Sequence, residues 1–458
     1  MEPTAINSPM SKRPMNLLNR VRQKRGVVEA LSNIGWLSGD RIIRMFGALI
    51  VGTLVARYLG PEQFGFLNYG IAIYGLFNII SNLGLDALIV RDLAIEASDE
   101  PQILGTGFIL KAIASVITTV AAIIASQFLD RHNATLAIIV ALLSFASISQ
   151  ALDVIDFFFQ AQIRSRHTVV PRTAAFIAGS VARLAAVLLH GGLLVFAWIA
   201  ALEILVGELG LVVSYLRYRR MIPRWSWNTA RAKSLMIESW PLLVSSLMVM
   251  IYMRTDQVLL GRLASMDAVG NYTAAIRFSE IWYAIPMIVT TSVMPRLLRS
   301  RDSDPDRYYS RIQTFYESMV LVSAVVTAGT LLFGPTIVKL FYGNKFSSAA
   351  SILSIHIWTG IFVSVGCVGG QQYVHEKITT SALQRTILGA VVNVILNLLW
   401  IPRWGGVGSA MATLVAQGVA SYLADALDRR TRHIFRMKTK AYIQFWMLPF
   451  RMLREGAQ

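Results

Sequence analysis

Ionisable side chains occur inside several apolar stretches of this sequence, and they carry both signs of charge. Five arginines are embedded in such stretches: Arg41, Arg44, Arg183, Arg254 and Arg277. A charged side chain at the middle of a bilayer costs at least about 2.5–3.5 kcal/mol, so such residues usually face a cavity or a partner. These five arginines are therefore the candidate substrate-binding residues, and the chemistry they predict is a cationic site.

The first of these stretches leaves two interpretations open. Asp40 and Arg44 are i,i+4 neighbours on a helix, and Arg41 and Arg44 are i,i+3 neighbours, so the three share one broad face. In one interpretation Asp40 and Arg44 form an ion pair near the interface while Arg41 extends toward water. In the other, two arginines against one carboxylate leave a net-positive face that lines a cavity.

The later arginines differ in how they could be neutralised. Arg172 and Arg183 are eleven residues apart, close to three helical turns, so both point the same way. Arg172 is expected at a helix end and Arg183 deeper in the membrane. Arg254 and Asp256 point to different faces of one helix, so Arg254 need not be neutralised by Asp256.

Four acidic residues are candidates either for binding a coupling ion or for pairing with an arginine: Asp40, Glu203, Asp256 and Glu280. Glu280 lies three residues after Arg277, which predicts an ion pair first and a binding site second. Glu203 is nearer mid-membrane, where it could carry a proton or neutralise an arginine.

Other polar residues are expected to serve packing or anchoring. Asp153 and Asp156 are predicted to anchor a helix at the interface, and Lys111 to extend toward water along the helix. Asn393 and Asn397 are i,i+4 neighbours that could form a hydrogen-bonded seam between helices. The sequence has no glycine-rich phosphate loop, no metal-spaced His or Cys cluster and no nucleophile motif. We therefore expect no enzyme activity, no cofactor and no metal.

The elements that must position these side chains are apolar helices. Of the 458 residues, 55% are hydrophobic and 15% are charged, whereas soluble chains carry roughly 25% charge. A bilayer core of about 30 Å needs about 20 apolar residues per helix. The sequence therefore predicts an all-α polytopic membrane protein with about 12 transmembrane helices. They are expected at 36–57, 65–89, 104–129, 136–158, 169–189, 193–216, 237–260, 272–295, 315–340, 350–374, 379–401 and 406–426.

The net charge is +17. Because most basic residues flank the apolar runs, this charge indicates membrane topology rather than nucleic-acid binding. About thirty Lys and Arg side chains fall on one side of the twelve-helix arrangement and five on the other. The positive-inside rule then predicts that both termini are cytoplasmic in the inner (cytoplasmic) membrane, and no nucleic-acid partner is expected.

The same arrangement divides the chain into five parts. A basic cytoplasmic segment at 1–34 precedes a six-helix lobe at 35–216. A basic cytoplasmic linker at 217–233 leads to a second six-helix lobe at 234–427, and a basic, aromatic cytoplasmic tail occupies 428–458. The two halves are faintly alike. LVARYLGPEQFGFLNYGIAI at 54–73 and LLGRLASMDAVGNYTAAIRF at 259–278 each end a helix and open the next one at Gly65 or Gly270, which is a common transporter design.

Three stretches carry a family resemblance: 57–94, 239–297 and 393–417. The middle stretch is the most specific, with Asp256 and Gln257 followed by Gly270, Tyr272 and EIWYAIP at 280–286. In order and spacing, residues 33–425 resemble the polysaccharide flippase (Wzx or O-antigen transporter) branch of the multidrug/oligosaccharidyl-lipid/polysaccharide exporter superfamily.

This resemblance implies two pseudo-symmetric lobes around a central cavity. It implies translocation of undecaprenyl-diphosphate-linked oligosaccharides by alternating access, for O-antigen lipopolysaccharide, capsule or exopolysaccharide. The arginines would suit the diphosphate, because guanidinium groups bind phosphate oxygens bidentately. The expected partners are the lipid-linked oligosaccharide, membrane lipids, and polysaccharide polymerase or assembly proteins.

Two alternatives remain at this point. A drug/cation antiporter of the same superfamily should have a net-acidic cavity, which the arginines disfavour. A membrane glycan polymerase or ligase is disfavoured by the short exterior loops and by the absence of a catalytic constellation.

Overall fold

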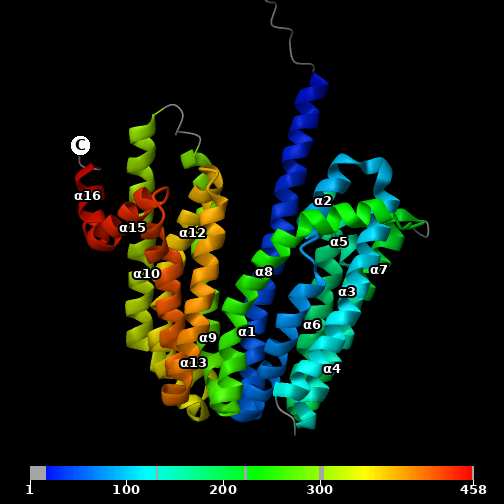
Figure 1. The fold of residues 1–458 in the computed structure, drawn as a ribbon, viewed down its shortest axis with the longest axis horizontal. Coiled ribbons are helices and arrows are strands. Elements are labelled where there is room, and N and C mark those ends of the chain that lie inside the picture. Colours follow the sequence, from blue (N-terminus) through cyan, green and yellow to red (C-terminus); the bar gives the residue numbers. More distant parts are fainter. Residues whose placement is uncertain (1–16, 130–132, 221–223, 299–303, 456–458) are drawn as a thin grey trace, which may run out of the picture.

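The computed structural model describes residues 17–129, 133–220, 224–298 and 304–455, and these residues are almost entirely helical, with no strand among them. Figure 1 shows two groups of helices that lie close together at one end and diverge toward the other. We call the helices before residue 220 the N-lobe and those after residue 228 the C-lobe. The all-α membrane class is thereby confirmed.

The N-lobe consists of seven α-helices and two short 3-10 helices. The α-helices are α1 (Leu17–Ser81), α2 (Asp86–Ile95), α3 (Glu100–Leu129), α4 (Ala134–Ser147), α5 (Val154–Ala161), α6 (Arg166–Leu188) and α7 (Leu193–Arg219), and the 3-10 helices are η1 (Ala97–Asp99) and η2 (Ile148–Asp153).

The C-lobe begins with α8, which starts beside the N-lobe and crosses to the other group (Figure 1). Its α-helices are α8 (Thr229–Leu263), α9 (Met266–Leu298), α10 (Pro305–Tyr342), α11 (Ser347–His356), α12 (Thr359–His375), α13 (Thr379–Gly418), α14 (Ala424–Leu427), α15 (Arg432–Gln444) and α16 (Leu448–Glu455). Its short elements are the 3-10 helices η3 (Asn344–Phe346) and η5 (Phe445–Met447) and the π-helix η4 (Val419–Leu423).

Within the described residues, nine helical stretches are long and apolar enough to span a membrane, or ten if the pair 344–356 and 359–375, bent by 44°, counts as one span. In two of the nine, a long α-helix is broken at a glycine. Gly60 has φ 74° inside α1, and Gly405 has φ 52° inside α13. The break at Gly60 follows from Pro61, because a residue before proline is disfavoured in the α region. Each of these two stretches therefore holds two helical arms, and the count of twelve spans stays a prediction.

The run expected as one helix at 136–158 is interrupted. The 3-10 helix η2 separates α4 from α5. The hydroxyl groups of Ser147 and Ser149 donate to the carbonyl oxygens of Ser144 (2.7 Å) and Ala146 (2.6 Å). Such bonds to the preceding turn compete with the helical ladder and bend helices.

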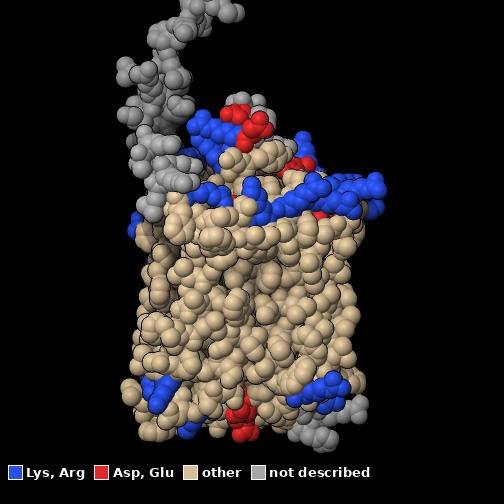
Figure 2. Space-filling view, turned by 90° about the vertical axis from the view of Figure 1, so that its left-hand side faces the viewer, with Lys and Arg blue, Asp and Glu red and all other residues tan. Residues whose placement is uncertain are grey.

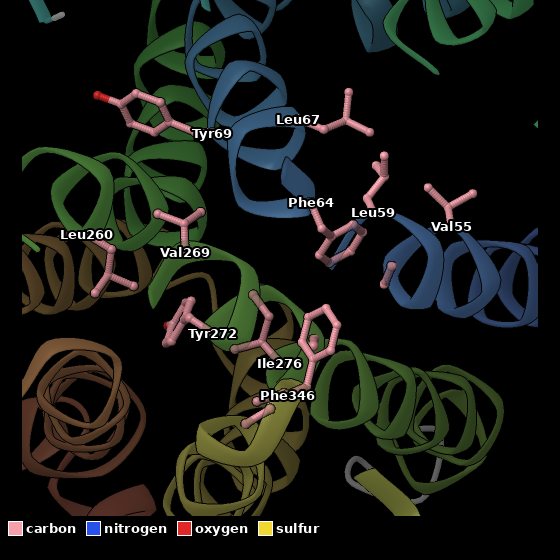
Figure 3. Close-up of a cluster of buried hydrophobic side chains, with 14 of the residues drawn as sticks. Val55, Leu59, Phe64, Leu67, Tyr69, Leu260, Val269, Tyr272, Ile276 and Phe346 are labelled. Carbon is pink, nitrogen blue, oxygen red and sulfur yellow. The ribbon is translucent and has the colours of Figure 1, made fainter. Parts of the chain in front are cut away.

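Buried apolar side chains form three clusters, and their distribution explains the shape. One cluster joins both lobes and includes Val55 and Phe64 of α1 with Val269 and Tyr272 of α9 (Figure 3). A second lies only within the N-lobe and the first turns of α8, and a third only within the C-lobe. The lobes therefore share a core at one end and have separate cores at the other.

The joined end depends on two glycines. A Cβ atom added at Gly65 would lie 1.8 Å from the carbonyl oxygen of Met266, and one added at Gly270 would lie 1.9 Å from that of Pro61. Any side chain at either position would collide with backbone. The close approach of α1 and α9 therefore requires glycine at both 65 and 270. These are the two glycines that open corresponding helices in the two faintly similar segments.

Basic side chains gather at the end where the lobes diverge, and Figure 2 shows them as a rim above a band almost free of charge. We call this the basic end and the other the joined end. Helix α1 already begins at Leu17, inside the segment expected to precede the first lobe, and α8 begins at Thr229, inside the expected linker.

The C-terminal tail is anchored at the basic end through a buried lysine. Lys438 of α15 is fully buried, and its Nζ donates to Asp425 Oδ2 (2.6 Å) and to the carbonyl oxygen of Ser421 (2.7 Å). Burial lowers the pKa of Lys438 to about 8. Helix α15 is therefore part of the C-lobe structure as well as a basic surface segment.

Candidate functional site

Arg44 lies in an ion pair. Its Nε donates to Asp40 Oδ1 over 2.8 Å, and Thr173 Oγ1 of α6 donates to the same oxygen over 2.5 Å. The guanidinium carbon lies 5.4 Å from the centre of the Phe176 ring. The geometry is that of the first interpretation of this stretch, in which Asp40 neutralises Arg44.

Arg41 points away from this pair toward the other lobe. Its Nη2 lies 3.6 Å from Met287 Sδ of α9, and the side chain is exposed. No carboxylate of the described residues lies within ion-pair distance of it. Arg41 is therefore a free cation placed between the lobes.

Arg183 is neutralised within the N-lobe. Its Nη1 lies 2.7 Å from Glu203 Oε2 of α7. Gly179 makes room for this carboxylate, because a Cβ atom at that position would lie 2.4 Å from Glu203 Oε2. Of the two roles left open for Glu203, the structure has it as the partner of an arginine.

A larger charge cluster surrounds Arg172, and the sequence did not reveal it. Its guanidinium group contacts Asp153, Asp156 (3.0 Å) and Glu208 (3.1 Å). Lys111 adds a second cation, 3.1 Å from Asp153, and is 1% exposed. The expectation that Lys111 extends to water was therefore wrong, and the two aspartates, expected as interfacial anchors, pair with cations inside the lobe. The turn of η2 aims Asp153 into the lobe, where Lys111 and Arg172 meet it.

These paired charges line a cavity of about 370 Å³ between α1, η2, α6 and α7. Its walls include Asp40, Arg44, Arg172, Glu203 and Glu208. Carboxylates outnumber the guanidinium groups that neutralise them here, so the polar cavity inside the N-lobe is not the cationic surface that the arginines predicted.

Arg254 and Arg277 lie in a different setting. Arg254 of α8 has one recorded polar contact, from Nη1 to Gln257 Oε1 at 3.5 Å, and that is the weak limit of a hydrogen bond. Arg277 of α9 crosses to the N-lobe, where its guanidinium carbon lies 5.1 Å from the Phe64 ring centre. A Cβ atom at Gly52 would lie 1.9 Å from its Nη1, so Gly52 leaves the space that Arg277 occupies.

Arg277 and Glu280, which the spacing predicted to pair, form no ion pair within 4 Å, and Arg254 forms none with any described residue. Glu280 interacts electrostatically with Arg254 and Arg277 over a longer distance. Arg41 and Arg277 therefore reach from one lobe to the other, whereas the contacts of Arg254 lie within the C-lobe, and none of the three forms an ion pair with a described residue.

Asp256 of α8 is 3% exposed and is held by neutral donors from two other helices, α9 and α13. Its Oδ2 accepts from Tyr272 Oη and Thr413 Oγ1, each at 2.6 Å, and its Oδ1 accepts from Asn397 Nδ2 at 2.8 Å. No cation of the described residues lies within ion-pair distance. Asn393 and Asn397 do form the expected seam, because Asn397 Nδ2 also lies 3.1 Å from Asn393 Oδ1.

This arrangement leaves the Asp256 carboxylate charged without a cationic partner, or neutral with a proton of its own. A buried charge without a counter-charge is expensive. A carboxylate beside two hydroxyl groups and no cation is therefore suited to take up a proton or a small hard cation. The sequence identified Asp256 and the two asparagines, but Tyr272 and Thr413 as its partners were missed.

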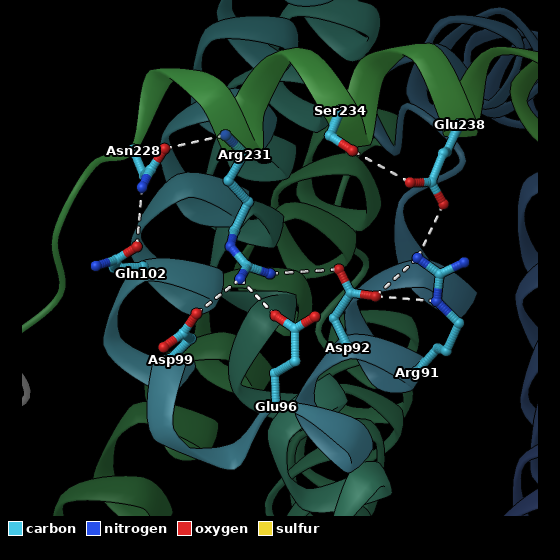
Figure 4. A network of polar contacts seen from close by, with 9 residues as sticks. All are labelled: Arg91, Asp92, Glu96, Asp99, Gln102, Asn228, Arg231, Ser234 and Glu238. Carbon is cyan, nitrogen blue, oxygen red and sulfur yellow. Dashed lines mark hydrogen bonds and ion pairs between the residues drawn. The ribbon is translucent and has the colours of Figure 1, made fainter.

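The start of α8 is fastened to the N-lobe by a network at the basic end (Figure 4). Arg231 contacts Glu96 (2.5 Å), Asp99 (3.0 Å) and Asp92 (3.6 Å). Arg91 contacts Glu238 at 2.9 Å. The helix that enters the C-lobe therefore begins as a fixed part of the N-lobe.

These features define a helical membrane transporter fold, with two lobes joined at one end and charged side chains between them. The fold is similar to that of the lipid II flippase MurJ in an inward closed conformation, with a TM-score of 0.67, 12% identity, and coverage of 91% of this chain and 92% of that one. It is also similar to an inward-facing multidrug resistance MATE transporter of the MOP superfamily, with a TM-score of 0.62, 16% identity, and coverage of 91% and 99%.

Comparison of the sequence with family models identifies the family within this class of transporters. Residues 30–301 match the family model described as polysaccharide biosynthesis protein, and residues 241–399 match the MatE model. The chain belongs to the polysaccharide biosynthesis protein family, the polysaccharide flippase branch of the MOP superfamily.

Two curated relatives come from Haloferax volcanii. The chain is 24% identical over 399 residues to Agl15, a probable low-salt glycan biosynthesis flippase, covering 83% of this chain and 81% of the relative. It is 30% identical over 210 residues to AglR, a probable flippase, and there the match spans 43% of this chain and 42% of the relative.

Proposed function

We propose that this protein translocates undecaprenyl-diphosphate-linked oligosaccharide repeat units across the cytoplasmic membrane for surface polysaccharide biosynthesis. The observation that carries the proposal is a set of three arginines with no ion pair among the described residues: Arg41 and Arg277, which reach from one lobe to the other, and Arg254 of α8. A diphosphate offers oxygens that planar guanidinium groups bind bidentately. The glycan products of such a pathway include O-antigen, capsule and exopolysaccharide.

The mechanism is alternating access around the joined end. In the described arrangement the lobes diverge at the basic end, and a repeat unit would enter from that side while its lipid tail stays in the bilayer. The arginines of α1, α8 and α9 would contact the diphosphate together, which requires both lobes. Arg44 and Arg183 are neutralised by carboxylates, so they would stabilise the structure around the site and would not bind the diphosphate first.

The orientation belongs to the same proposal. The basic rim would face the cytoplasm, with both termini on that side, as the positive-inside rule expects. Reporters fused within 224–228 and after Gln458 should report a cytoplasmic location, and one near Lys345 an external one. An external location at the C-terminus would overturn this orientation.

Asp256 is proposed as the coupling residue. Its cage of hydroxyl and amide groups would bind a proton or a cation whose release is linked to movement of the lobes. The match of 241–399 to the MatE model favours, as a second candidate function, a drug/cation antiporter that uses the same residue. Export of a cationic drug that persists in Arg254→Ala would favour that antiporter.

One experiment tests the proposed function directly. The gene is deleted and lipid-linked repeat units are followed by a probe that reaches only the outer leaflet. The expected result is a complete repeat unit that stays on the cytoplasmic side. An incomplete unit, or a complete unit exposed outside but not polymerised, would identify an enzyme instead.

A further inference from the structure

A basic pocket of about 620 Å³ lies at the basic end of α6 and α7. Three arginines line it: Arg166, Arg217 and Arg220. All three are exposed, and none has a carboxylate of the described residues within ion-pair distance. The pocket is therefore lined by three cations whose N–H groups can donate hydrogen bonds to a ligand.

An apolar groove of about 580 Å³ adjoins this pocket. It runs between α1 and α6, and Val170 lines both the groove and the basic pocket. Gly35 and Gly39 form part of the α1 wall, and a Cβ atom at either would meet nothing within 4 Å. These two glycines, one helical turn apart, keep the groove open.

The two walls are fixed to each other where the groove meets the pocket. The backbone N–H of Ser165 donates to Asn33 Oδ1 over 2.8 Å. The guanidinium carbon of Arg166 lies 5.3 Å from the centre of the Trp36 ring. An aromatic ring beside a cation at this level is typical of a membrane–water interface.

The far end of the groove reaches the charge pair of α1. Asp40 and Thr173, which are hydrogen-bonded to each other, both line the groove. Asp40 also lines the 370 Å³ polar cavity of the N-lobe. A chain lying in the groove would therefore be separated from that cavity by the Asp40 side chain.

We propose that the basic pocket and the groove together bind one anionic phospholipid from the leaflet that meets the basic end. Its phosphate lies among Arg166, Arg217 and Arg220, and one acyl chain lies along Gly35 to Ile43. That part of α1 is about 12 Å long, slightly less than half of a bilayer core of about 30 Å. The site therefore fits a chain that ends within its own leaflet, and a polyprenyl chain would extend far beyond it.

The site shares α1 with Arg41, but none of Arg41, Arg254 and Arg277 lines the groove or the basic pocket, so this proposal goes beyond the proposed function. Basic clusters close to the membrane attract anionic lipids. The pocket adds a fixed geometry to that general attraction, because its three arginines line a recess that adjoins an apolar groove at Val170.

The test is lipid binding to the purified full chain, measured by native mass spectrometry during titration with phosphatidylglycerol or phosphatidylcholine. The test variant is Arg166→Gln/Arg217→Gln/Arg220→Gln. The matched control is Arg429→Gln/Arg430→Gln/Arg432→Gln, three arginines at the same end that line neither pocket. We expect phosphatidylglycerol to bind at least about tenfold more tightly than phosphatidylcholine, and the test variant to lose on the order of 100-fold in affinity for it.

The groove is tested separately. Gly39→Leu should weaken binding of both lipids by about tenfold by filling the channel, because about four methylene-sized groups are added where no atom lies nearby. Gly75→Leu is the control, since a Cβ atom there also meets nothing within 4 Å. Unchanged gel-filtration profiles would show that the variants are folded.

Three outcomes would overturn the proposal. Equal affinity for the two lipids would remove the phosphate site. An equal loss in the control triple variant would reduce it to general surface charge. Displacement of phosphatidylglycerol by an equimolar polyprenyl diphosphate would identify the substrate lipid as the occupant.

Discussion

In the N-lobe, the buried Lys111 and the half-buried Arg172 and Arg183 each form an ion pair with a carboxylate. In α8 and α9 of the C-lobe, Arg254 and Arg277 have none among the described residues, and the carboxylate of Asp256 is held only by hydroxyl and amide groups. The charge cluster inside the N-lobe is thus neutralised by its own members, whereas the charges of α8 and α9 are not paired with one another.

Paired and unpaired charges in a membrane have different roles. A neutralised cluster adds rigidity, and loss of one member leaves its partners buried and unpaired. Separated charges keep their capacity for a mobile ligand, at a cost in stability that only function would justify. Substitutions should therefore affect abundance in the N-lobe and transport in the C-lobe.

The largest expected effect is on the stability of the N-lobe. Arg172→Gln leaves Asp153, Asp156 and Glu208 without their shared counter-charge, and removal of one partner from a buried ion cluster costs about 3–5 kcal/mol. We expect a strong loss of folded protein in the membrane, measured by thermal unfolding of the detergent-solubilised protein. Arg164→Gln, an exposed arginine near the same helix, is the control. Normal stability of Arg172→Gln would break the comparison.

The next largest effect is on transport. Arg254→Ala should lower the rate of glycan export by about 10- to 100-fold, because a charge-assisted hydrogen bond to a phosphate is worth about 1.5–3 kcal/mol. Abundance should stay near normal, and Arg254→Lys should restore part of the rate. Arg262→Ala, at the exposed end of the same helix, should export normally. Full export by Arg254→Ala at normal abundance would remove the cationic site from the mechanism.

A somewhat smaller effect is expected at the coupling residue. Asp256→Asn keeps the size of the side chain and removes its charge, so we expect the fold to persist and the rate in proteoliposomes to fall about tenfold. The remaining transport should no longer respond to an imposed proton or sodium gradient. Glu62→Gln, an exposed acid near the joined end, should respond as the parent does. A gradient response retained by Asp256→Asn would place coupling elsewhere.

The smallest effect is expected when both members of an N-lobe ion pair are replaced together. Arg183→Met/Glu203→Leu replaces a paired charge with apolar residues of similar size, which is often neutral or stabilising. We expect less than about a twofold change in export and a melting temperature equal to or above that of the parent. Arg183→Met alone should be clearly less stable, because it leaves Glu203 unpaired. A large loss of export in the stable double variant would show that this pair takes part in transport.

Much of the fold could be predicted from the sequence, because apolar runs of about 20 residues need helices in a membrane. The breaks at Gly60 and Gly405 lie in the gaps left between expected helices, at 58–64 and 402–405. The interruption of 136–158 by η2 was not predictable, since an apolar run looks the same whether its helix is continuous or bent by serine hydroxyl groups.

The candidate site was likewise predictable only in part. The Asp40–Arg44 pair lies within one helix, so its i,i+4 spacing was enough to suggest it. The partners of Arg172 and Asp256 come from other helices, and the rotation of one helix against another depends on packing that a single sequence does not contain. For the same reason, Lys111 was expected in water and lies buried beside Asp153.

The shared core at the joined end has a consequence for biogenesis. It takes side chains from Val51 to Ala410, whereas the core of the N-lobe at the basic end needs none beyond Leu235. The N-lobe can therefore pack its basic end while later helices are still being synthesised, but the seam where Gly65 meets Gly270 must wait for partners hundreds of residues away. Contacts of such high sequence separation form slowly. The half-made chain would thus expose an apolar surface on α1 in the membrane, which marks this interval as the one in which membrane chaperones would matter most.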